Sequence, residues 1–437
     1  MQQKWMVMSV KRYVALLWMA LFLVLSVTPA AVQAHAGLMG SQPKDNEVLQ
    51  ANPGQISMRF TEVLEPDLVA IHLYNWKGEE VQLEAPTLQP GDASQVNAKL
   101  PDLPEGTYTA IVSVVSEDGH PVEERLTFSI GQKSASVVDP TAQKSDSSYL
   151  IVYRYLTQGI LLLGGGLYLL AWRGERYGLP SFGKLLGIMR QIGWGLAIIG
   201  LVFLWFLYDE SLAAVSLTDA LWQGSWSVLM QSSFAMMLLV SLGLLILLAI
   251  PGMVSGWYVI LWLALLCTQA FGGHAWGISP VWLSLLLRVL HVLTVSLWMG
   301  ALFYLLLTYR QAERGNEGFK AFFLRTVAVA SLLAVLTGIA MLGIQTNVIA
   351  IFQSSLTWSY LFYGKVAAVC VMLVIAFWQT KNWRQKNALR PLLLRWEVAL
   401  GIVAILAGMW MSQTQYPTTV DSSTTDSATT VIHQHQH

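Results

Sequence analysis

The spacing of apolar residues divides the 437-residue chain into two main regions. Residues 35–132 contain short runs in which apolar and polar residues alternate, as in 56–60 and 108–114, and turns rich in Pro, Gly, Asn and Asp separate these runs. Alternation at period two with regular turns predicts an all-β, Ig-like sandwich, and the signal sequence and basic-residue pattern of the chain make this domain extracytoplasmic. From residue 149 onward the alternation stops and long apolar segments take over.

Eight apolar segments follow, each close to or longer than the roughly 20 residues that an α-helix needs to cross a bilayer. They cover residues 149–170, 188–208, 228–250, 253–271, 282–307, 321–345, 360–380 and 392–412. Residues 149–412 are therefore predicted to form a transmembrane bundle of eight helices. Only a short Pro-Gly segment separates the third helix from the fourth.

Composition and the placement of basic residues support this interpretation. Charged residues make up 12% of the chain, about half the share typical of soluble domains. The connections at 209–227, 272–281 and 346–359 contain no Lys or Arg, whereas the first, fifth and seventh connections contain several. The positive-inside rule then places the sandwich and both mature termini outside the cell (plasma) membrane. A net charge of zero gives no electrostatic reason to expect nucleic acid as a partner.

The first 34 residues are expected to be a signal peptide. Basic residues precede an apolar run, and Val32-Gln33-Ala34 fits the small-x-small rule for cleavage. An uncleaved signal anchor is the alternative. Cleavage would make His35 the first residue, and its α-amino group and imidazole would offer two nitrogen ligands of the kind that Cu(II) favours.

Asp118-Gly119-His120 is the second candidate for metal binding outside the membrane. A turn at Gly119 can bring a carboxylate and an imidazole together, and with His35 they would form the N/O donor set that suits Cu(II). Asp-Gly alone is mainly a turn signal. From residue 35 to residue 148 there are 17 Asp and Glu against 7 Lys and Arg, and such an acidic domain concentrates cations around it.

Two polar segments flank the membrane half. Residues 133–148 are predicted to be a linker, and residues 413–437 a disordered tail that ends in alternating histidines. These histidines either form a weak metal site or belong to a tail without function. They are His433, His435 and His437. Because Cys267 and Cys370 both lie in apolar runs, neither a disulfide framework nor a cysteine-based zinc site is expected.

Several polar residues of the membrane half are candidates for a metal pathway. Arg288 and His291 are separated by three residues and share one helix face, and ionisable groups inside a membrane usually face a pathway or a partner. Lys365 and His274 are further candidates, with snorkelling to the interface and an ordinary loop position as their respective alternatives. Thioethers in the apolar helices could bind Cu(I), although most methionines there serve packing.

The external region resembles the copper-binding CopC family. The matching stretches are His35-Ala36, Ser41-Gln42-Pro43, Asn52-Pro53, Arg59-Phe60, the 103–108 segment Leu-Pro-Glu-Gly-Thr-Tyr, the 116–121 segment Ser-Glu-Asp-Gly-His-Pro, and Phe128-Ser129-Ile130. This resemblance implies a Cu(II) site formed by His35, Asp118 and His120. With only Met39 and Met58 in this domain, a second, methionine-rich Cu(I) site is not expected, and His72 is expected on a strand face.

The membrane half resembles the CopD family, most strongly over residues 270–410. The residues that carry the resemblance are Gly273-His274-Ala275, Arg288-Val289-Leu290-His291, Leu297-Trp298-Met299-Gly300, Thr337-Gly338, Tyr363-Gly364-Lys365 and Arg395-Trp396-Glu397. The domain order resembles a CopC–CopD fusion of the YcnJ type, which implies copper capture and import without enzymatic activity.

Three alternative functions remain open from the sequence. They are a haem- or copper-dependent membrane redox enzyme, a copper-resistance protein that does not transport, and a copper sensor. A redox enzyme would require an open coordination position on the metal. A sensor would need a cytoplasmic domain, and the inner loops are too short to form one. Because no P-loop motif is present, transport would follow a gradient or be coupled to reduction.

Overall fold

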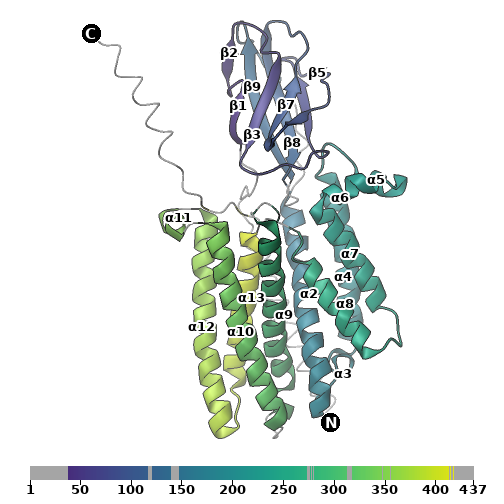
Figure 1. Cartoon of the computed structure of the whole chain (residues 1–437), viewed down its shortest axis with the longest axis vertical. Coiled ribbons are helices and arrows are strands. Elements are labelled where there is room, and N and C mark those ends of the chain that lie inside the picture. The colour runs from purple at the N-terminus through teal and green to yellow at the C-terminus, as the bar shows by residue number, and fades with distance from the viewer. Residues whose placement is uncertain are drawn as a thin grey trace, which may run out of the picture.

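The computed structural model describes residues 38–116, 121–138, 147–272, 276, 278, 280–312, 317–346, 348–354, 356–412, 414 and 417. Figure 1 shows a β-sandwich standing on one end of a bundle of long helices. The predicted signal peptide and most of the predicted tail lie outside the described residues.

Two sheets form the sandwich, as the alternating pattern predicts. One sheet has the strand order β1-β3-β7-β6 and the other the order β2-β9-β8-β4-β5. All neighbouring strands pair antiparallel except β2 and β9, which are parallel. The strands are β1 (Leu38–Gln42), β2 (Glu47–Leu49), β3 (Gln55–Phe60), β4 (Ala70–Tyr74), β5 (Glu80–Val81), β6 (Thr87–Gln89), β7 (Asp92–Lys99), β8 (Gly106–Val115) and β9 (Pro121–Ile130).

The core of the sandwich lies between the two sheets. Met58 and Val96 from one sheet pack with Tyr108, Val112 and Leu126 from the other. Each strand contributes alternate residues because successive side chains of a strand point to opposite faces. The Tyr108 hydroxyl donates to the Pro104 carbonyl at 2.8 Å, which satisfies the one polar atom that this ring brings into the core.

The membrane half contains long helices joined by short ones. They are α2 (Ser147–Gly174), the 3-10 turn η1 (Glu175–Tyr177), α3 (Phe182–Leu186), α4 (Ile188–Glu210), α5 (Leu217–Gln223), α6 (Trp226–Gln231), α7 (Ser233–Leu248), α8 (Ser255–Thr268), α9 (Val281–Ala312), α10 (Glu317–Gln345), α11 (Val348–Gln353), α12 (Thr357–Lys386) and α13 (Pro391–Met411).

Six of the described helices are long and apolar enough to cross a membrane. They cover Val152–Tyr177, Ile188–Glu210, Val281–Ala312, Glu317–Gln345, Thr357–Lys386 and Pro391–Met411. The third and fourth segments of the sequence prediction form the shorter apolar helices α7 and α8. Ser232 shortens α7, because its side chain accepts a hydrogen bond from the Ala235 amide and caps a new helix there. The chain is thus a multi-pass membrane protein with six candidate spans.

Helices α2 and α9 pack backbone to backbone at two glycines. A Cβ atom at Gly300 would overlap the backbone of Gly166 and Leu167, and one at Gly166 would overlap the Ser296 carbonyl. Small residues allow helices in a membrane to approach this closely. The Ser296 hydroxyl also donates to the Leu162 carbonyl at 2.7 Å, so a polar contact reinforces the same crossing.

Candidate metal centre and membrane route

The three predicted Cu(II) ligands, His35, Asp118 and His120, lie outside the described residues. Their nearest described neighbours in the chain are Leu38, Ser116 and Pro121. Strand register brings these neighbours to one end of the sandwich. Leu38 pairs with Phe60 at the end of β3, Ser116 forms a bridge to Leu64 just beyond β3, and Pro121 pairs with Val115.

This end of the sandwich faces the helices (Figure 1). The segment between β3 and β4 makes the connection. On one side its Glu65 amide donates to the Val115 carbonyl at 2.8 Å. On the other side the Asp67 amide donates to Oε1 of Gln231 in α6 at 3.2 Å, and Nε2 of Gln231 donates to the Asp67 carboxylate. One short segment therefore links the strand ends beside the predicted ligands to the membrane half.

Acidic residues gather around the same end. Glu62, Glu65 and Asp67 lie in the β3–β4 segment, and Glu123 lies near the start of β9. Burial raises the pKa of the neighbouring Glu124 carboxyl. A concentration of carboxylates next to the candidate site attracts cations to it.

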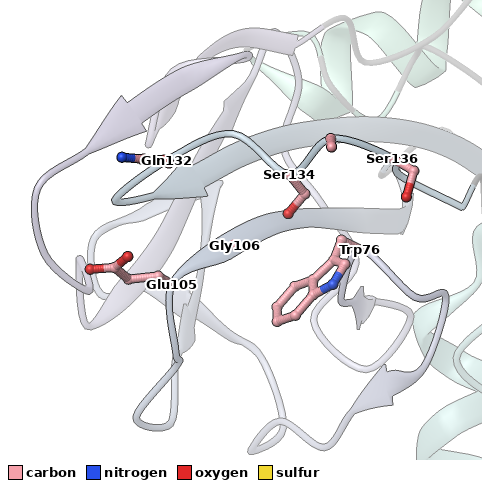
Figure 2. A pocket seen from close by; sticks show the side chains of 7 residues that line it. Trp76, Glu105, Gly106, Gln132, Ser134 and Ser136 are labelled. Atoms are coloured by element: carbon pink, nitrogen blue, oxygen red, sulfur yellow. The ribbon is translucent and has the colours of Figure 1, made fainter.

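A depression of about 410 Å³ lies at the opposite end of the sandwich. Figure 2 shows Trp76, Glu105, Gly106 and Ser134 around it. Gly106 pairs with Ile130, which lies nine positions along β9 from Pro121 at the predicted metal end. Glu105 is its one side chain of the kinds that commonly bind metals, so the depression offers no donor set for copper.

In the membrane half, Arg288 binds the end of the connection that contains His274. Its Nη2 atom donates to the Gly272 carbonyl at 2.6 Å. His274 itself lies outside the described residues, two positions further along the chain. The guanidinium therefore anchors the start of the α8–α9 connection near the outer end of α9.

His291 is held by a hydroxyl on the neighbouring helix. Its Nδ1 atom lies 3.0 Å from Oγ1 of Thr337 in α10. That hydroxyl donates its own proton to the Leu333 carbonyl at 2.7 Å, so it accepts from Nδ1–H of His291. This assignment leaves the lone pair on Nε2, and a hydrogen bond at the other nitrogen is the usual arrangement for a metal-binding histidine.

Lys365 reaches across to α13. Its Nζ atom lies 2.9 Å from the position that a Cβ would occupy at Gly408, so a larger residue at 408 would displace the ammonium group. Arg288, His291 and Lys365 thus come from two helices of the outer half of the bundle and make three different contacts. Among the described residues, no three His, Cys, Asp or Glu side chains converge on one point.

The other histidines of the sequence prediction are less informative. His72 lies on β4 as expected, where its Nδ1 atom is 2.7 Å from Oε1 of Glu80. The tail residues His433, His435 and His437 lie outside the described residues, and their role stays a prediction.

Sequence reasoning assigned no contact or binding role to four residues that the structure makes relevant. Asp67 and Gln231 are separated by 164 positions, and nothing in either segment indicates their contact. Met372 is one of many methionines in apolar runs. Glu397 gave the clearest available signal, because a carboxyl group inside an apolar segment is costly and usually functional.

Comparisons with known proteins agree with this division of the chain. The CopC domain family matches residues 38–131. The chain is 25% identical over 433 residues to the copper transport protein CutJ of Bacillus subtilis, covering 89% of this chain and 76% of that protein. It is 33% identical over 111 residues to copper resistance protein C of Xanthomonas campestris pv. juglandis, covering 24% of this chain and 87% of that protein.

A solved structure is also similar to the external domain. It is the crystal structure of CopC from Methylosinus trichosporium OB3b, with 25% identity, 24% of this chain and 100% of that chain covered, and a TM-score of 0.22. The likeness to CutJ extends far beyond the CopC region. The predicted resemblance to a CopC–CopD fusion is confirmed as a CopC domain followed by a helical membrane region.

Proposed function

Starting from a chain that belongs to the CopC family through residues 38–131, we propose that the protein captures Cu(II) outside the plasma membrane and mediates copper import. His35 supplies its α-amino group and imidazole after signal-peptide cleavage, and Asp118 and His120 complete an N/O donor set. Nitrogen and oxygen donors in a tetragonal arrangement suit Cu(II).

One observation carries the proposal. Strand register brings the described neighbours of all three ligands to the sandwich end that contacts α6 through Asp67 and Gln231. Copper released from that end would face the outer half of the bundle, where His274, Arg288, His291 and Lys365 form the candidate route. The name of CutJ, a copper transport protein, supports transport rather than catalysis.

We further propose that α7 and α8 are the third and fourth crossings of an eight-helix bundle. At 1.5 Å per residue, the 16 residues of α7 extend about 24 Å, and α6 precedes it directly. Two further crossings keep the start of α9 on the side of the sandwich, in agreement with the basic inner loops. Labelling a cysteine placed at Gly252 with a membrane-impermeant reagent tests this, because labelling of intact cells would contradict an inner position.

The capture site is tested by Cu(II) titration of the purified full chain. Asp118→Asn and His120→Ala should each weaken binding by about tenfold or more, because each removes a ligand from a set of four donors. His35→Ala should do the same if signal cleavage is preserved, which mass spectrometry of the mature terminus verifies. His72→Ala is the matched control, since that histidine contacts Glu80 on a strand. Unchanged affinity in the ligand variants would refute the site.

The direction of transport is tested by copper uptake. Cells that express the chain should accumulate more copper than cells that express His120→Ala, with equal amounts of protein in the membrane. Equal accumulation with better growth on copper would favour the alternative, a resistance protein that binds copper without transporting it. A Soret band in the purified protein would instead favour a haem-dependent redox enzyme.

A further inference from the structure

One face of α13 carries mostly small residues and points into the bundle. It contains Glu397, Gly401, Ala404 and Gly408, which are spaced by four, three and four residues and therefore align along the helix. Lys365 from α12 contacts this face at Gly408, toward the outer end of α13. The other end of this face, toward the inner side, carries the carboxyl group of Glu397.

Two thioethers meet this face between those ends. A Cβ atom at Gly401 would overlap Sδ and Cε of Met299 from α9, and it would lie 3.1 Å from Cε of Met372 from α12. Met299 is 2% exposed and Met372 is 1% exposed. The absence of a side chain at 401 is therefore what allows methionines from two different helices to approach the same point.

Glu397 lies one turn further inward on the same face. It is 2% exposed, and its Oε1 atom has no hydrogen-bond partner among the described residues. A buried polar atom without a partner destabilises the fold, and an intramembrane carboxyl group is usually retained for a function. Packing alone accounts for two buried methionines, but it gives no reason for a buried carboxyl group one turn away on the same helix face.

We propose that Met299, Met372 and Glu397 form an internal site for a soft monovalent cation, the cuprous ion, between the outer route and the inner side. Thioethers select Cu(I) among biological cations, and the carboxyl oxygen supplies an additional donor and a compensating charge. Gly401 lies about 10 Å inward of Gly408 and about 6 Å outward of Glu397 at 1.5 Å per residue. The site thus continues the line that begins at Lys365 and His291.

This inference rests on the proposed copper transport and adds its inner binding step. Because capture is of Cu(II), each ion gains one electron before it enters the bundle, and a thiol reductant outside the membrane supplies it (2 Cu²⁺ + 2 RSH → 2 Cu⁺ + RSSR + 2 H⁺). The ion then reaches the internal site as Cu(I), and the site binds it without changing its oxidation state. Nitrogen-rich ligands at the sandwich and thioethers in the bundle would then separate the two oxidation states of the cargo by position.

The test uses Ag(I), a soft monovalent ion without accessible redox chemistry under these conditions, on the purified full chain. Calorimetric titration should show one tight equivalent in the wild type that Met299→Leu and Met372→Leu each weaken by about tenfold or more. Leucine conserves the volume of methionine, and swaps that conserve volume are well tolerated in a core, so the variants should fold. Met237→Leu is the matched control, because that methionine is equally buried but packs in a different cluster.

Glu397→Gln provides the second variant, since it keeps the shape of the side chain and removes its charge. It should weaken Ag(I) binding while leaving the thermal midpoint unchanged or raised. Equal Ag(I) affinity in wild type and both leucine variants would overturn the proposal, as would an equal loss in the Met237→Leu control. Cu(II) titration of the same samples separates the two hypotheses, because loss of the internal site should leave capture at His35, Asp118 and His120 intact.

Discussion

Replacing Gln231 by alanine should release the sandwich from the membrane half. The Gln231 amide group both accepts from the Asp67 backbone and donates to the Asp67 carboxylate. Alanine removes both interactions and leaves the fold of each half intact, because the residue is the last of the six-residue helix α6 and its side chain is not part of a core.

The size of the effect follows from these two hydrogen bonds. Each contributes about 0.5–1.5 kcal/mol net, and both groups are exposed, which favours the lower half of that range. A loss of about 1–2 kcal/mol changes the ratio of docked to undocked sandwich by roughly 5- to 30-fold. The short tether that follows the sandwich keeps the two halves near each other in either state.

Pulsed electron–electron double resonance (DEER) between two spin labels measures the ratio of docked to undocked sandwich. Lys99 on the sandwich and Asp219 on α5 are exposed and suit labelling, after Cys267 and Cys370 have been replaced by alanine. Wild type should give one narrow distance distribution, and Gln231→Ala should broaden it. Copper uptake should fall in parallel, since the metal end of the sandwich would face the route for a smaller share of the time.

A charge exchange distinguishes this contact from a general loss of structure. Gln231→Glu places two carboxylates together and should broaden the distribution more than alanine does. Adding Asp67→Asn should restore the narrow distribution, because the side-chain amide now at position 67 donates to the carboxylate now at position 231. If the double variant stays as broad as the single one, or if alanine has no effect, the contact does not hold the sandwich in place.

Two further predictions concern the bundle. Gly300→Ala should lower the thermal stability of the full chain by the equivalent of about 1–3 kcal/mol through overpacking. Gly243→Ala is the control and should be neutral or stabilising, because a Cβ at 243 meets open space. Equal thermal midpoints for the two variants would contradict the α2–α9 contact. Thr337→Val should reduce copper uptake by about 10- to 100-fold, the usual cost of removing the hydrogen-bond partner of a ligand histidine. Thr337→Ser keeps the hydroxyl group and should retain uptake. Wild-type uptake by the valine variant would exclude the proposed role of His291.

The predictable features are those encoded locally. Alternation with period two and the turns between runs predict the sandwich, and long apolar runs predict the main helices. The start of α7 escaped prediction because residues 228–250 are apolar almost throughout, and the capping contact of Ser232 is visible only in the structure. A single serine in such a run does not indicate a helix break.

Contacts between distant segments could not be predicted. Nothing near Met299 or Met372 indicates that both approach Gly401, because that depends on how three helices pair. The contact between Asp67 and Gln231 has the same origin. The copper ligands His35, Asp118 and His120, which lie outside the described residues, are proposed from motif and resemblance, and the structure adds where their described neighbours lie.

The glycine contact between α2 and α9 also bears on how the protein could alternate between outward- and inward-open states. Within an apolar 18-residue window of each helix, 56% of the residues of α9 are buried, against 17% for α10 and 11% for α12. Helices in backbone contact cannot separate without losing that packing, so a conformational change that keeps this contact would move α2 and α9 as one unit. Rocking motions in transporters move one group of helices against another around the binding site. A transport cycle of this kind would therefore have to move other helices of the bundle around the α2–α9 pair.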